Sequence, residues 1–107
     1  MRLLLLVLPL LVGCGVLEGG TGCDFRDQDP GDARCQERLG TQATGFDAAC
    51  EGLGDTVIEG GCDLTGAIAG CSTTIAGGTI TDWYYAPETL ETVTATCADD
   101  DAELVTP

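Results

Sequence analysis

Histidine is absent from this 107-residue chain, and basic residues are scarce. Without histidine, the chain lacks the commonest general base, the commonest metal ligand and the usual Ser–His and Cys–His nucleophiles. Its four basic residues are all arginine, against 18 acidic residues. Nucleic-acid binding needs Lys and Arg at the phosphates, so the composition excludes DNA and RNA as partners. The same deficit argues against electrostatic docking on anionic lipid headgroups.

Catalytic motifs are missing as well. The hydroxyl run Ser72-Thr73-Thr74 has no His partner, and the chain contains no nucleophile elbow, no phosphate-binding loop and no Cys-x-x-Cys pair. Carboxylate pairs such as Asp82 with Glu88 or Glu91 remain as acid–base candidates, but chance proximity explains them better in so acidic a chain. We therefore predict that the protein is not an enzyme and holds no cofactor.

A short apolar leader opens the chain. Arg2 precedes an unbroken apolar run from Leu3 to Gly13, and Pro9 lies in the middle of this run. A transmembrane helix needs about 20 apolar residues, so this run is too short to span a bilayer. A basic start followed by a short apolar stretch is the layout of a secretory signal, which we place at residues 1–13.

The leader ends on Leu11-Val12-Gly13-Cys14, which resembles the lipobox of bacterial lipoproteins. This resemblance implies that a diacylglyceryl group is attached to the sulfur of Cys14 and that the leader is cleaved before it. Two or more acyl chains hold a protein stably on a membrane. In that family the residue after the cysteine influences sorting, and Gly15 favours the outer membrane. The expected location is therefore the cell envelope, with the membrane as a partner through Cys14.

Six further cysteines follow Cys14, and in an oxidising compartment an even number predicts three disulfides. Zinc sites usually show closely spaced Cys pairs, and no two cysteines here are close enough. A domain this short is marginally stable without such crosslinks. The six residues are Cys23, Cys35, Cys50, Cys62, Cys71 and Cys97.

The chain is expected to have four parts. The signal at 1–13 is followed by an acidic Gly/Asp-rich tether at 14–33, a disulfide-stapled domain at 34–98 and an acidic tail at 99–107. The tether contains Asp24, Asp27, Asp29 and Asp32, whose spacing does not fit a calcium-binding loop. A solvated loop is the favoured interpretation of this stretch.

Local patterns predict the elements of the domain. Apolar spacing predicts a helix over 44–53, opened by a capping box at Thr44–Asp47, and a turn of helix at 34–39. Stretches rich in β-branched and aromatic residues predict strands at 56–59, 68–75 and 79–85. A second helix is expected from Pro87 through Cys97. The fold class is then a small disulfide-rich α+β domain, a three-stranded antiparallel sheet with two helices in the order α-β-β-β-α.

A meander of these three strands would place both helix C-termini over one edge of the sheet. It would bring Cys50 near Cys97 there, and place Cys62 and Cys71 together at the opposite edge. Cys23 would then close a local loop with Cys35. The predicted disulfides are therefore Cys23–Cys35, Cys50–Cys97 and Cys62–Cys71.

Residues 44–97 also resemble small cysteine-rich exported proteins of myxobacteria. This resemblance implies no activity. It is carried by Cys50, Gly52, Leu53, Gly54, Cys62, Gly70, Cys71, Tyr84, Tyr85 and Cys97.

Three consecutive aromatic residues are the candidate binding residues. Side chains alternate along a strand, so Trp83 and Tyr85 should share one face and Tyr84 the other. An exposed face would stack on a sugar ring or a peptide, whereas a buried one would be core, which we favour. The favoured function is a non-enzymatic structural or binding module at the cell envelope, with an envelope protein or a glycan as partner. A carboxylate-based hydrolase or a calcium-dependent binding protein is the alternative.

Overall fold

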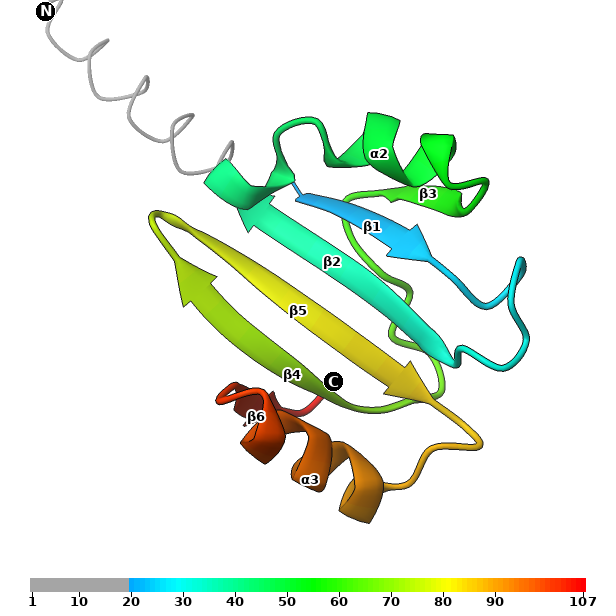
Figure 1. Cartoon of the computed structure of the whole chain (residues 1–107), viewed down its shortest axis with the longest axis vertical. Helices are drawn as coiled ribbons and strands as arrows, with labels where there is room; N and C mark the ends of the chain where they lie inside the picture. The colour runs from blue at the N-terminus through cyan, green and yellow to red at the C-terminus, as the bar shows by residue number, and fades with distance from the viewer. Residues whose placement is uncertain (1–19) are drawn as a thin grey trace, which may run out of the picture.

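One antiparallel sheet of six strands forms the centre of the protein, in the order β3-β1-β2-β5-β4-β6 (Figure 1). The computed structural model describes residues 20–107, so the predicted signal and Cys14 lie outside the described residues. The elements are β1 (Gly20–Asp24), β2 (Arg34–Gly40), the 3₁₀ helix η1 (Thr41–Ala43), α2 (Phe46–Gly52), β3 (Thr56–Glu59), β4 (Ala67–Ile75), β5 (Gly78–Tyr85), α3 (Leu90–Asp99) and β6 (Glu103–Val105).

The sheet corrects the predicted fold class. The strands predicted at 56–59, 68–75 and 79–85 are present as β3, β4 and β5, and both main helices are present as α2 and α3. The expected three-stranded meander is wrong, because β3 pairs with β1, and both β1 and β2 lie between β3 and β5. The chain between β3 and β4 runs from one edge of the sheet toward the opposite edge.

The segment 34–39 was predicted as a turn of helix and is instead part of a central strand. Its Gln, Glu, Arg and Leu residues favour helix in isolation. In the fold, β2 is paired along its length with β1 on one side and β5 on the other, and those backbone hydrogen bonds override local propensity. Cys35 is fully buried between the half-buried Arg34 and Gln36, which is the alternation of a strand.

Two more strands lie where the sequence indicated a tether and a tail. The glycine-rich strand β1 is inserted between β3 and β2, although its composition is typical of a loop. Gly22 shows why a glycine is needed there, since a Cβ atom would lie 2.9 Å from the carbonyl carbon of Gly61. The short strand β6 pairs with residues 70–72 of β4 at the edge of the sheet.

The hairpin between β4 and β5 has a two-residue turn. Ile75 pairs with Gly78, and the two residues between them, Ala76 and Gly77, have φ values of 41° and 87°. Positive φ at both central positions is typical of the type I′ turn, whose twist matches that of the flanking strands. Glycine suits the second of these positions because it lacks a Cβ atom.

Helix α3 carries the capping box that was predicted for α2. The residue before α2 is Gly45, in a left-handed conformation, and no side chain caps that helix. The predicted box at Thr44–Asp47 is therefore wrong. In α3, the Thr89 hydroxyl accepts from the Thr92 amide, and the Thr92 hydroxyl accepts from the Thr89 amide. The threonine hydroxyl of Thr92 thus does what the Glu or Gln side chain does in the usual capping box, and each of the two residues accepts the backbone N–H of the other.

The two faces of the sheet are covered differently. Residues paired across an antiparallel sheet point to the same face, which places Cys23, Gln36, Asp82 and Cys71 in one row. We call this side the helix-bearing face, because α2 packs on β1 and β3 there, and α3 packs on β4 and β6. The other side, the loop-bearing face, is covered in part by the chain between β3 and β4.

Three small apolar clusters make up the core. Under α3, the cluster contains Ala69, Cys71, Val93 and Cys97. Under α2, it contains Cys23, Phe46 and Cys50. On the loop-bearing face it contains Cys35, Trp83 and Tyr85, with partly buried apolar residues of the covering loop packed against them. Each cluster includes one disulfide, so crosslinks and apolar burial reinforce each other.

All six cysteines of the described residues form disulfides, but none of the predicted pairings is right. The bonds are Cys23–Cys50, Cys35–Cys62 and Cys71–Cys97, with Cα–Cα distances of 5.8, 6.1 and 5.1 Å. The prediction assumed that β3 and β4 are neighbours. Because β1, β2 and β5 lie between them, Cys62 meets Cys35 of the central strand instead of Cys71.

Candidate functional site

The aromatic row of β5 is mainly core. Trp83 and Tyr85 share the loop-bearing face, as alternation predicted, and their exposed fractions are only 6% and 4%. Tyr84 points to the other face, where it is half-buried against the cluster under α3. Burial raises the pKa of the Tyr84 hydroxyl and of the Tyr85 hydroxyl. Trp83 and Tyr85 are therefore not available to stack on a ligand.

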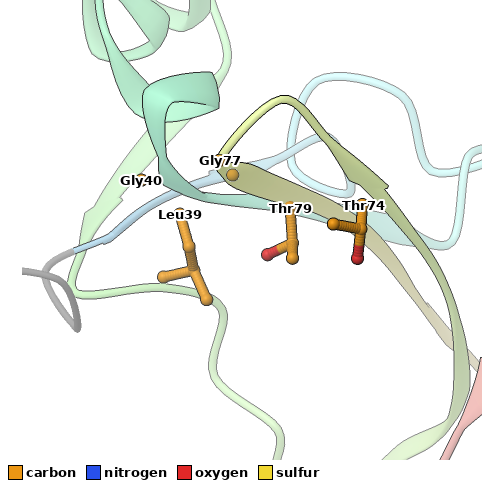
Figure 2. Close-up of a pocket in the computed structure, with 6 residues that line it drawn as sticks. Leu39, Gly40, Thr74, Gly77 and Thr79 are labelled. Carbon is orange, nitrogen blue, oxygen red and sulfur yellow. The ribbon is translucent and has the colours of Figure 1, made fainter.

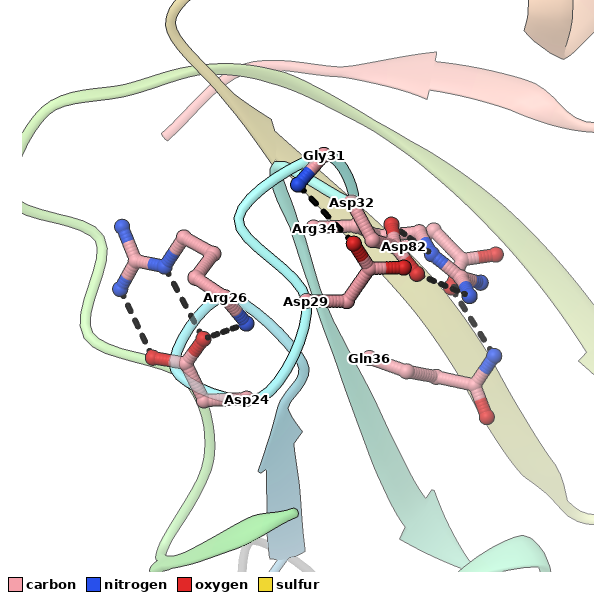
Figure 3. Close-up of polar contacts among 8 residues, drawn as sticks. All are labelled: Asp24, Arg26, Asp29, Gly31, Asp32, Arg34, Gln36 and Asp82. Atoms are coloured by element: carbon pink, nitrogen blue, oxygen red, sulfur yellow. Dashed lines mark hydrogen bonds and ion pairs between the residues drawn. The ribbon is translucent and has the colours of Figure 1, made fainter. Parts of the chain in front are cut away.

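Tyr85 anchors the covering loop to the sheet. Its hydroxyl donates to the backbone carbonyl of Asp63, and the Arg26 guanidinium stacks 3.7 Å from the centre of its ring. Arg26 is held in turn by Asp24, through hydrogen bonds of 3.0 Å from Nε and 2.8 Å from Nη2 (Figure 3). Trp83 Nε1 is buried and has no hydrogen-bond partner among the described residues.

A row of polar side chains follows the two central strands on the helix-bearing face. We call it the polar row; its members are Arg34, Gln36, Arg38 and Asp82. The Asp82 carboxylate accepts from Arg34 Nη1 at 3.1 Å and from Gln36 Nε2 at 2.9 Å (Figure 3). Arg38 Nε donates to the Gln36 side-chain oxygen at 2.9 Å, which extends the row along β2.

Arg38 differs from the other described arginines. Arg26 is paired with Asp24, and Arg34 with Asp32 and Asp82, whereas no carboxylate in residues 20–107 pairs with Arg38. Its guanidinium lies 4.3 Å from the centre of the Phe46 ring and is fixed at Nε by Gln36. Both terminal nitrogens therefore remain as donors for a carboxylate or a polar ligand, in a side chain that is already positioned.

Two of the acid–base candidates of the sequence, Asp82 and Glu88, have separate hydrogen-bond partners. Asp82 is bonded to Arg34 and Gln36, and the Glu88 carboxylate accepts from the Thr92 hydroxyl at 3.0 Å. The hydrogen bonds from the Arg26 side chain lower the pKa of Asp24, and those from Thr65 lower the pKa of Asp63. A general acid working near neutral pH needs the opposite shift.

In the described part of the chain, no three Cys, Asp or Glu side chains are grouped so that they could hold a metal ion. Of the four aspartates in the predicted loop, Asp24 and Asp32 are used in ion pairs with Arg26 and Arg34. The Asp29 side chain accepts from the Gly31 amide at 3.0 Å and closes the turn (Figure 3).

A shallow hollow lies at the end of the sheet next to the β4–β5 turn. Its volume is about 250 Å³, slightly below the range of about 300–1,000 Å³ typical of small-molecule sites. In Figure 2, the side chains of Leu39, Thr74 and Thr79 project from the strands on one side, which the register identifies as the loop-bearing face. The lining is completed by Gly40, Gly77 and Gly78.

Sequence reasoning missed both the polar row and the hollow. The available signal for the polar row was an alternating pattern, in which the polar residues Arg34, Gln36 and Arg38 alternate with residues such as the buried Cys35. The same polar residues are also good helix formers, which hid this signal. The hollow depends on the pairing of β2 with β5, which lie about 40 residues apart in sequence and have no local signal.

No protein-family model matches the chain, and no curated protein and no solved structure matches it either. Within residues 20–107, no helix is long and apolar enough to cross a membrane.

Proposed function

We propose that this protein is a lipid-anchored, non-enzymatic binding module of the cell envelope. The observation that carries the proposal is the use of the cysteines. The chain has seven, and three disulfides use all six that lie within residues 20–107. Cys14 therefore has no cysteine in the domain to pair with, and it is the residue at which the lipobox sequence ends.

The place of the disulfides in the core supports the same proposal. Disulfides persist in oxidising compartments outside the cytoplasm, and small exported domains depend on them because their cores are limited. Here each of the three core clusters contains a disulfide, so a reducing compartment would remove a central part of each cluster. Gly15, following the lipobox cysteine, favours the outer membrane as the destination.

The polar row is the surface that we assign to binding. Within residues 20–107 the two terminal guanidinium nitrogens of Arg38 have no partner, and Asp82 and Gln36 add acceptors and donors on the same face. Planar donors beside a carboxylate and an amide suit hydroxyl-rich glycans or polar peptide segments. An envelope glycan or protein is therefore the expected partner class. A carboxylate-based hydrolase or a calcium-dependent binder gains less support, because the pKa values of Asp24 and Asp63 are lowered and not raised, and no three Cys, Asp or Glu side chains of residues 20–107 are grouped to hold an ion.

Fatty-acid labelling tests the anchor. Cells that express the full chain and are grown with radiolabelled palmitate should yield a labelled, membrane-bound protein. The Cys14→Ser variant should lose the label and leave the membrane fraction. Gly19→Ser serves as the control for a serine introduced into the same segment. Equal labelling of both variants would overturn the anchor.

Sedimentation with purified peptidoglycan sacculi tests the polar row. Arg38→Gln should reduce co-sedimentation, because it removes the guanidinium that we assign to the ligand. Thr94→Asp changes the net charge by the same amount at an exposed position on α3 and should leave binding unchanged. Sedimentation that is indifferent to Arg38→Gln would exclude the row as a glycan site.

A further inference from the structure

We propose that one end of the sheet rests against the lipid headgroups of the membrane, an inference that depends on the lipid anchor proposed above. We call it the uncharged end. It consists of the start of β1, the end of β2 with η1, and the β4–β5 turn with the strand ends beside it: Gly20, 39–43 and 73–79.

The register brings these segments to one level of the sheet. Gly20 pairs with Leu39, Leu39 pairs with Thr79, and Thr79 pairs with Thr74. Side-chain hydrogen bonds hold η1 onto the turn, from the Thr41 hydroxyl to the Ala76 carbonyl at 2.8 Å and from Gln42 to the Ile75 carbonyl. Segments far apart in sequence therefore form one compact end.

This end lacks charge in a chain that is otherwise rich in it. Residues 39–46 and 64–81 contain no charged residue, although the chain has 18 acidic residues. Two charged strand residues of the described chain lie beside this end, both opposite Thr21: the acidic Glu59 on the edge strand β3 and the basic Arg38 on β2. The acidic loop 25–33 lies at the other end, where Asp24 pairs with Cys35.

The attachment point of the lipid determines which end faces the membrane. Five residues lie between Cys14 and Gly20, and the six Cα–Cα steps from one to the other reach at most about 20 Å. Because Gly20 belongs to the uncharged end, this end is held near the bilayer. The eight residues of β5 span about 26 Å, which carries the acidic loop further away.

Electrostatics favours the same orientation. An acidic surface pressed on anionic lipids is repelled, and the repulsion falls off over a screening length of about 8 Å at physiological ionic strength. At the other end of β5, the acidic loop lies beyond that length. The uncharged end instead presents threonine hydroxyls, the shallow hollow and Ile75, whose exposed fraction is 42%. These groups can meet headgroups without burying a charge.

Photo-crosslinking of the acylated full chain in vesicles of phosphatidylethanolamine and phosphatidylglycerol tests the orientation. Ile75→p-benzoylphenylalanine places the probe at the uncharged end, and Gln28→p-benzoylphenylalanine places it on the exposed acidic loop. Irradiation should give several-fold more lipid adduct from position 75 than from position 28. Thr74→p-benzoylphenylalanine repeats the test at a second exposed site if the first variant does not fold.

The outcomes separate this inference from the anchor on which it rests. An acylated, vesicle-bound protein with equal adducts at both positions, or with more at position 28, would overturn the orientation and leave the anchor standing. A protein that is not acylated and stays in solution would overturn both.

Discussion

Cys23 and Cys71 lie in one row across four strands of the helix-bearing face, and each is bonded to a different helix. Gln36 and Asp82 occupy the positions between them. The two disulfides therefore hold α2 and α3 over the outer strands, while the polar row remains between the anchor points. The third disulfide, Cys35–Cys62, pins the covering loop on the opposite face.

Removal of the disulfide under α3 should destabilise the protein and release that helix. Together, Cys71→Ala and Cys97→Ala should lower the free energy of unfolding by about 2–5 kcal/mol, because the unfolded chain loses a crosslink. Denaturant titration measures the change, and amide exchange in α3 should accelerate most. Leu90→Ala, at a side chain that is 54% exposed, is the control and should change stability by less than about 0.5 kcal/mol. A double variant with wild-type stability would contradict the pairing of Cys71 with Cys97.

The packing of Trp83 on Gly70 can be followed through fluorescence, because the chain has one tryptophan. A Cβ atom on Gly70 would lie 2.8 Å from Cε3 of the indole ring, so Gly70→Ala should displace the ring and cost about 1–3 kcal/mol. Its emission spectrum should change as well. Gly52→Ala, in α2 with open space around the new atom, should instead stabilise the protein by up to about 1 kcal/mol. Equal effects of the two variants would argue against this packing.

Asp24 should make stability depend on pH in the acid range. Hydrogen bonds from Arg26 lower its folded-state pKa below the ordinary value of 3.8, so between the two values the unfolded chain binds more protons. Its contribution is then present above about pH 4 and is lost as pH falls through the folded-state pKa. Asp24→Asn should cost about 1–2 kcal/mol at pH 7 and much less near pH 2. Asp29→Asn, which keeps an acceptor for the Gly31 amide, is the control. A cost that is the same at both pH values would refute the linkage.

Salt should stabilise the protein slightly. With 18 acidic and four basic residues, most carboxylates are mutually repulsive, and monovalent ions screen that repulsion. The melting temperature should therefore rise modestly with sodium chloride, and calcium and magnesium should act alike at equal ionic strength. A large stabilisation by micromolar calcium alone would instead establish the calcium-dependent alternative.

Sequence patterns identified the elements whose local signals agree with their environment. The Thr, Ile, Trp and Tyr residues of β5 favour a strand anywhere, and the strand formed where expected. β1 and β2 were missed because their glycine-rich and helix-favouring compositions conflict with their places in the sheet. That error propagated to the disulfides: with β1 and β2 left out, Cys23 and Cys35 had only each other as partners. The polar row was hidden for the same reason, since Arg34 and Asp82 meet only through the pairing of β2 with β5.

Mass spectrometry of the protein purified intact from membranes tests the central claim most directly. If the chain is a lipid-anchored envelope module, its mature N-terminus is Cys14, and the N-terminal peptide carries the added mass of a diacylglyceryl group on the sulfur. The six remaining cysteines should be recovered as the three disulfides of the domain. A mature chain that keeps the leader, or one that retains Cys14 with an unmodified thiol, would contradict the account.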